Sequence, residues 1–91
     1  MYQITEYTKK KAKQLGVIVE PSENKNKKID VYKDKKKIAS VGSIGYMDYP
    51  NFIKEKGLDY ANKRRMAYKN RHNKDRKIVG SNGYWADRLL W

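Results

Sequence analysis

Apolar residues are sparse along this chain, and the first of them are spaced as in a helix. In "TEYTKKKAKQLG", Tyr7, Lys11 and Leu15 fall on one helical face. Thr5 is a suitable N-terminal cap, and Gly16 is a natural stop. The pattern predicts an N-terminal helix between these two residues, with its lysines on the exposed side.

The next apolar positions alternate, as in a strand. Ile29 and Val31 alternate with polar neighbours, and Ile38 and Val41 mark a second strand beyond the polar turn "KDKK". This predicts a β-hairpin with one apolar face and one face that carries Lys and Tyr, in contact with water or with nucleic acid. The run "VIVE" at 17–20, ended by Pro21, is either a third short strand or an extended connector.

A short helix is predicted after the hairpin, in "DYPNFIKEKG". Asp48 can cap it, Pro50 suits its first turn and Gly57 ends it, which leaves Phe52 and Ile53 pointing inward. A longer helix follows over 58–74. Its apolar stripe is narrow and the rest of its surface is basic, which favours an anion-binding helix face.

The last segment, "GSNGYWADRLLW", is rich in large apolar residues. Ser81 or Asn82 can start a short C-terminal helix. Aromatic side chains of this size dominate both cores and interfaces, so this end either folds back onto the hairpin or inserts into a partner. The residues assigned to a partner interface are Tyr84, Trp85, Leu90 and Trp91. The predicted core consists of Ile29, Val31, Ile38, Val41, Phe52, Leu58, Tyr84, Trp85 and Leu89.

These elements predict an α+β fold in a single small domain, residues 1–91, with an N-terminal helix, a hairpin or three short strands, a basic helix and an aromatic-rich C-terminal helix. The chain has 91 residues, of which 38% are hydrophobic, and no cysteine. A core of this size typically stabilises a domain by only about 3–5 kcal/mol. We therefore expect help from a partner or from self-assembly.

Charge gives the clearest indication of function. The chain carries 22 Lys and Arg against 10 acids, for a net charge of +12. Such a surface attracts phosphates, acidic proteins or anionic membranes. The residues predicted to bind an anion or nucleic acid are Lys9, Lys10, Lys11, Lys13, Lys63, Arg64, Arg65, Lys69, Arg71, Lys74, Arg76 and Lys77.

The residues that catalysis or metal binding needs are scarce. There is one histidine, His72, and no cysteine, and no Ser or Asp is placed to complete a triad with that histidine. The aspartates are scattered, without the dense spacing of a metal site. We expect no enzyme activity, no metal, no cofactor and no small-molecule substrate. No stretch is apolar enough for membrane insertion, so we expect a soluble protein made in a cytoplasm.

Three stretches carry a resemblance to a known family. They are "KKIDVYKDKKKIASVGSIGYMDYPNFI", "YANKRRMAYKNRHNKDR" and "GSNGYWADRLLW", and they cover about residues 28 to 91. Together they resemble small basic proteins of unknown function encoded by large double-stranded DNA viruses, including algal and amoebal giant viruses and some tailed phages. The resemblance implies a viral origin, with synthesis in the host cytoplasm and a place in the virion. It implies no catalytic residue.

Two hypotheses follow for such a protein. The first is a virion structural protein, a minor capsid or capsid-associated component that binds larger, acidic major or minor capsid proteins through its basic surface and aromatic C-terminus. The second is a protein that coats or condenses viral DNA without sequence preference. Binding to DNA would weaken steeply with salt, whereas a contact with apolar anchors would depend on salt less.

Overall fold

The computed structural model describes residues 2–91 and contains one three-stranded antiparallel sheet in the order β1-β2-β3. This confirms the α+β prediction, and residues 18–20 of the 17–20 run belong to a third strand, which Val17 precedes. The elements are α1 (Glu6–Leu15), β1 (Ile18–Pro21), β2 (Lys27–Lys33), β3 (Lys36–Ser43), α2 (Tyr49–Lys56), α3 (Leu58–Arg71), a 3₁₀ turn η1 (Asp75–Lys77) and α4 (Asn82–Leu90).

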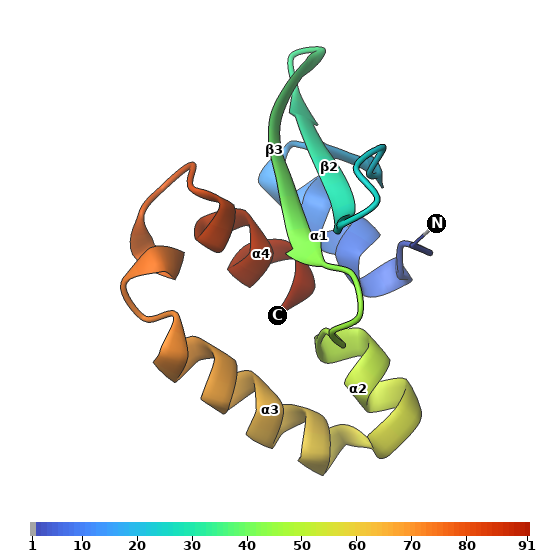
Figure 1. The fold of residues 1–91 in the computed structure, drawn as a ribbon, viewed down its shortest axis with the longest axis vertical. Helices are drawn as coiled ribbons and strands as arrows, with labels where there is room; N and C mark the ends of the chain where they lie inside the picture. The colour runs from blue at the N-terminus through green and yellow to red at the C-terminus, as the bar shows by residue number, and fades with distance from the viewer. Residues whose placement is uncertain (1) are drawn as a thin grey trace.

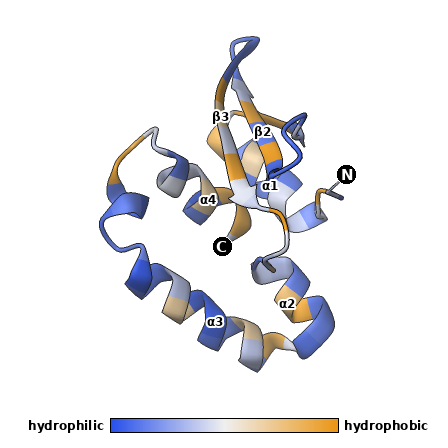
Figure 2. Cartoon of the chain, in the orientation of Figure 1, coloured by the Kyte–Doolittle hydropathy of each residue, from blue (hydrophilic) through white to orange (hydrophobic). Residues whose placement is uncertain are grey.

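The helices form two groups around the sheet (Figure 1). Helix α1 runs behind the sheet and α4 beside β3, whereas α2 and α3 form a separate hairpin of helices below them. The C-terminus ends between these two parts. Figure 2 shows that α3 is hydrophilic over most of its length, as expected for a helix with a narrow buried stripe.

The predicted caps are confirmed. Thr5 accepts a hydrogen bond from the Thr8 N–H, and Ser81 accepts one from the Tyr84 N–H at 3.1 Å. Asp48 caps α2, with Pro50 in its first turn. Gly16 ends α1 with a φ of 72°, a conformation that side chains other than glycine's disfavour. Local chemistry therefore sets the ends of these helices.

The main core lies between the sheet, α1 and α4. Ile29, Val31 and Val41 project from the sheet against Trp85 and Leu89 of α4. A second, smaller core is formed by Tyr49, Phe52 and Ala61 of the α2–α3 hairpin. Trp91 packs against both cores. The final residue of the chain thus links the two parts of the molecule.

Three residues predicted to point inward are exposed instead. Ile38 is 40% exposed. It lies at a register shift, because Val31 pairs with Ala39 and Tyr32 with Lys37, which leaves Ile38 between the two pairs. It also stands three positions from Val41, and residues an odd number apart face opposite sides of a strand. Leu58 is 56% exposed and Ile53 is exposed as well. Leu58 begins α3 beside the Gly57 corner, and the second core reaches only to Ala61.

The hairpin face predicted to be wet is largely buried along β2. Asp30 is 1% exposed and accepts hydrogen bonds from the hydroxyls of Ser22 and Ser40, both at 2.6 Å. Burial raises the pKa of this carboxyl, but those hydroxyls, the Glu23 N–H and the charge of Lys37 outweigh burial, so that its pKa lies below the usual value.

Asp30→Asn should lower the free energy of unfolding by about 1–3 kcal/mol at neutral pH. The folded-state pKa of Asp30 is depressed below its ordinary 3.8, so its stabilisation is complete above that value and is lost as the pH falls through the folded pKa. The variant should therefore lose stability less steeply in acid than the wild type does. Thermal unfolding followed by circular dichroism from pH 6 to pH 2 measures this.

Asp34→Asn is the matched control. Asp34 lies in the exposed hairpin turn with a φ of 52°, which asparagine also adopts readily. We expect the wild-type acid profile for this variant. An Asp30→Asn profile parallel to the wild type's would contradict the role assigned to the buried carboxylate.

Candidate anion-binding groove

Helix α3 and the segment that follows it carry exposed cations with no acidic partner in residues 2–91. Lys63, Arg64 and Arg71 are exposed, and no carboxylate in residues 2–91 pairs with any of them. Lys74 and Lys77 are exposed beyond the end of the helix. These five predicted anion ligands therefore keep their charges available.

Arg65 differs from its neighbours because its donors are used inside the molecule. Its Nε donates to the Trp91 carbonyl oxygen at 2.8 Å, and its Nη2 donates to the Tyr7 hydroxyl at 2.8 Å. The guanidinium lies 3.6 Å from the centroid of the Tyr49 ring. Arg65 thus connects α1, α2 and α4 to α3. Binding of an external anion by Arg65 remains a prediction, and such binding would compete with these internal contacts.

Two other predicted ligands also have internal partners. Lys69 forms an ion pair of 3.1 Å with the buried Asp87 of α4. Arg76 donates to the Asn73 side chain at 3.3 Å. Lys69 therefore fastens α4 to α3 and is less available to a partner than Arg64 or Arg71.

The four predicted lysines of α1 form a second basic run. Lys9 pairs with Glu6 at 3.4 Å, and the Lys11 ammonium lies 5.7 Å from the Tyr7 ring centroid. Lys10 and Lys13 are exposed. Figure 1 shows α1 behind the sheet, and the hydrogen bond between Tyr7 and Arg65 connects α1 with α3.

The C-terminal residues predicted for a partner interface belong mostly to the core. Trp85 and Leu90 are buried, and Leu90 is only 1% exposed. Tyr84 and Trp91 are half-buried against the same core. An interface role for Trp85 and Leu90 would require this end of the chain to leave the sheet, whereas Trp91 reaches the surface.

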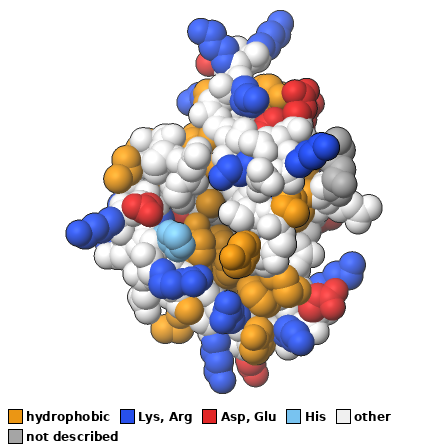
Figure 3. Space-filling model, in the orientation of Figure 1, with side chains coloured by type: hydrophobic (Ala, Val, Ile, Leu, Met, Phe, Trp, Pro, Cys, Tyr) orange, Lys and Arg blue, Asp and Glu red, His pale blue; other side chains and the backbone are white. Residues whose placement is uncertain are grey.

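A groove of about 560 Å³ lies between α3 and the elements β3 and α4. Lys27 of β2 and Arg64 and Arg71 of α3 reach it from opposite sides. His72 and Asp75 lie at the end of α3, with 3.6 Å between His72 Nδ1 and Asp75 Oδ2. Figure 3 shows hydrophobic side chains in this hollow, with His72 and Lys or Arg side chains at its margin.

Aromatic rings form the floor of the groove. Tyr68 stacks on Trp91 with 4.4 Å between ring centroids, and Phe52 lies 5.9 Å from Trp91. The Arg64 guanidinium lies 5.4 Å from the Phe52 centroid. Burial, followed by the charges of Asp87 and Asp75, raises the pKa of Tyr68 to about 12, so this hydroxyl stays neutral at physiological pH.

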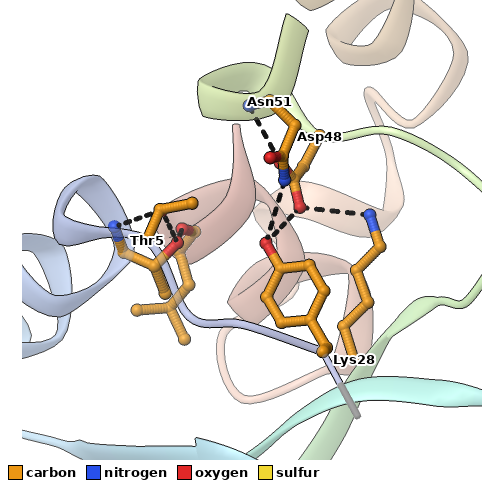
Figure 4. Close-up of polar contacts among 7 residues, drawn as sticks. Thr5, Lys28, Asp48 and Asn51 are labelled. Atoms are coloured by element: carbon orange, nitrogen blue, oxygen red, sulfur yellow. Dashed lines mark hydrogen bonds and ion pairs between the residues drawn. The ribbon is translucent and has the colours of Figure 1, made fainter. Parts of the chain in front are cut away.

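A buried polar network sets the position of α2 relative to the sheet (Figure 4). The Lys28 ammonium lies 3.1 Å from Asp48 Oδ2, and the Tyr2 hydroxyl donates to the same carboxylate. Asn51 donates to the other oxygen of Asp48 at 2.7 Å. Burial, then the hydrogen bond to Asp48 and its negative charge, raise the pKa of Tyr2. The network joins β2, α2 and the N-terminal segment, and so fixes one wall of the groove.

Sequence reasoning missed several residues of this site. Lys27 and Phe52 line the groove but were not predicted as ligands. Tyr68 is another groove residue that the sequence pattern does not predict as a ligand. The available signal was the i, i+4 spacing of Tyr68 and His72, whose rings lie 4.5 Å apart. The pairing of Lys28 with Asp48, across 20 positions, had no local signal.

Within residues 2–91, the one histidine of the sequence, His72, lines the groove. No group of three or more potential metal ligands comes together in this part of the chain. His72 lies 3.6 Å from Asp75 through its Nδ1, and its ring lies 4.5 Å from that of Tyr68. None of the described helices has the length and apolar character needed to cross a bilayer.

Comparisons of the chain with models of protein families, with characterised proteins and with solved structures found no match.

Proposed function

We propose that this chain is a non-enzymatic structural protein of a viral particle, which binds an acidic surface of a larger capsid protein. One observation carries the proposal: Arg64 and Arg71 have no acidic partner in residues 2–91 and border an aromatic groove. Unpaired arginines beside aromatic rings are typical of protein-binding surfaces. The resemblance to small basic viral proteins supports a capsid partner.

Exposed apolar residues on α3 favour a protein over duplex DNA as the partner. Leu58, Tyr60 and Met66 are all more than 40% exposed on the same helix as the free cations. Phosphate contacts need only cations and hydrogen-bond donors, and apolar side chains contribute nothing to them. Tyr and Met are enriched in protein interfaces, where they are buried among Arg residues.

The composition of purified particles tests the proposal directly. A capsid component should be present at a fixed copy number in the virus that encodes it, and should remain with empty shells from which DNA has been removed. A protein that leaves with the genome, or that varies in copy number between preparations, would contradict the proposal.

Arg64→Glu with Arg71→Glu should reduce the affinity for emptied capsids at least tenfold, while the fold is retained. Both side chains are exposed, and neither takes part in an ion pair within residues 2–91 that the reversal of charge would break. Like charges facing an acidic surface would then repel. Sedimentation of the purified protein with emptied capsids measures the loss, and circular dichroism checks the fold.

Lys10→Glu with Lys13→Glu is a control that changes the net charge by the same amount. Both lysines are exposed on α1, away from the groove. This variant should keep most of the affinity. An equal loss in the two variants would contradict a site on α3. Duplex DNA binding whose affinity falls log-linearly with salt, together with absence from emptied capsids, would support genome binding instead.

A further inference from the structure

The groove between α3, β3 and α4 has features that a flat acidic surface would leave unused. Its floor is aromatic, with Phe52, Tyr68 and Trp91, and its volume of about 560 Å³ falls within the usual range of about 300–1,000 Å³ for binding pockets. A flat acidic surface would contact only the cations at the rim of the groove. The apolar floor therefore indicates a ligand group that enters it.

We infer that the groove binds a short acidic peptide segment of the partner, with an aromatic or long aliphatic side chain inserted against Phe52 and Trp91. This inference rests on the proposed function, because it takes the partner to be a protein. It adds the form of the contact, an extended segment held in a groove.

Charge at the groove favours an acidic segment. Lys27, Arg64 and Arg71 contribute three cations, whereas Lys28 is paired with Asp48. Among the described residues that line the groove, the one acidic side chain not paired with a lysine or arginine is Asp75, which faces His72. The rim therefore keeps an excess of positive charge. Arginine suits carboxylates because its planar donors can bind both oxygens of the group.

The spacing of the two arginines favours an extended segment. Arg64 and Arg71 are seven residues apart on α3, which corresponds to about 10 Å along the helix axis. Residues three apart in an extended chain are also separated by about 10 Å. An extended segment of about four residues therefore spans the two arginines, with the acidic side chains on one of its sides toward the guanidinium groups and the apolar side chains on its other side toward the floor.

The arrangement of the rings disfavours a nucleic-acid base as the ligand. Tyr68 and Trp91 are stacked with 9° between their planes, so one face of each ring is already covered. The Arg64 guanidinium lies near the Phe52 ring, and His72 lies near Tyr68. Bases bind aromatic residues by stacking on open ring faces, whereas apolar side chains also pack against ring edges.

Trp91 provides a fluorescent reporter inside the groove. In a Trp85→Phe background it is the only tryptophan of the chain. The probe is a capped hexapeptide of four Glu and two Phe. We expect a saturable change in Trp91 emission, and at least tenfold weaker binding for the same peptide with Ala in place of Phe. Equal affinity for the two peptides would overturn the inference, because the floor would then contribute nothing.

A variant that fills the groove without changing charge locates the binding. Ser43 is exposed at the end of β3 and lines the groove, so Ser43→Phe should reduce the affinity for the Phe peptide at least tenfold. Ile38→Phe is the control, since Ile38 is exposed on the same strand and is not among the groove residues. Loss of affinity in both variants, or in neither, would contradict a site in the groove.

The outcomes separate this inference from the proposed function. If wild-type protein binds emptied capsids but not the Phe peptide, and Ser43→Phe leaves capsid binding intact, the inference fails and the proposed function stands. If wild-type protein binds neither, both fail. Tighter binding of oligothymidylate than of the Phe peptide, abolished by Ser43→Phe, would overturn the peptide inference in favour of single-stranded nucleic acid.

Discussion

Replacing Lys28 by Met should lower the free energy of unfolding by about 3–5 kcal/mol, the usual effect of removing one partner from a buried ion pair. The Lys28 and Asp48 side chains are 6% and 1% exposed, with 3.1 Å between the ammonium and the carboxylate. Without the ammonium, the Asp48 carboxylate stays buried with only neutral donors, from Tyr2 and Asn51. Desolvation of this charge is then no longer offset.

A second variant separates the cost of the orphaned charge from the loss of packing. Lys28→Met combined with Asp48→Asn removes both charges, and asparagine is as good a helix cap as aspartate. The double variant should recover most of the lost stability, as replacing whole buried ion pairs often does. Urea unfolding measures all three proteins, and a single variant already unfolded at 25 °C counts as the expected result. A double variant no more stable than the single one would contradict this account.

The network of Lys28 and Asp48 shows where local sequence patterns stop being informative. Thr5, Asp48 and Ser81 were identified as helix caps because a cap bonds to a backbone N–H only a few residues away. The second role of Asp48, as partner of Lys28, depends on how α2 is placed against β2. A lysine in an alternating strand is ordinarily exposed, so its burial could not be predicted from the pattern.

The register of the hairpin illustrates a similar limit. Ile29, Val31 and Val41 were correctly assigned to the core, because each is an apolar position in a strand that alternates. Ile38 was assigned to it wrongly, because the irregularity between the Val31 and Tyr32 pairings cannot be read from hydrophobicity alone. Ala39 takes the inward position beside it, and a small residue gives little signal in the pattern.

The candidate site could be predicted only in part, because contacts between residues far apart in the sequence decide which arginines of α3 are available. The basic character of α3 is evident in the sequence, and Arg64 and Arg71 are exposed with no ion pair in residues 2–91. Arg65 has the same chemistry but a different position around the helix, where it meets Tyr7 and Trp91. Its internal role depends on the return of the C-terminus to α3, a contact between residues 26 positions apart.

Trp85→Ala should lower the free energy of unfolding by about 3–5 kcal/mol, because it leaves a cavity in the main core between α4 and the sheet. Trp85 is only 9% exposed and packs with Ala12, Val17 and Leu89. A loss of this size approaches the entire stability of many domains of this length. The same variant also tests the alternative role of Trp85 at a partner interface. Unchanged stability together with lost capsid binding would assign it to the interface.

Trp85→Phe should lower the free energy of unfolding by much less than the smaller size of the phenylalanine ring alone would suggest. The Trp85 Nε1 is buried and finds no acceptor in the described residues. A buried donor without an acceptor costs about 1–3 kcal/mol, and phenylalanine removes that donor while it keeps most of the aromatic volume. We therefore expect Trp85→Phe to lie within about 1 kcal/mol of the wild type in urea unfolding, far from Trp85→Ala. A loss near that of the alanine variant would show that the indole N–H is bonded in solution.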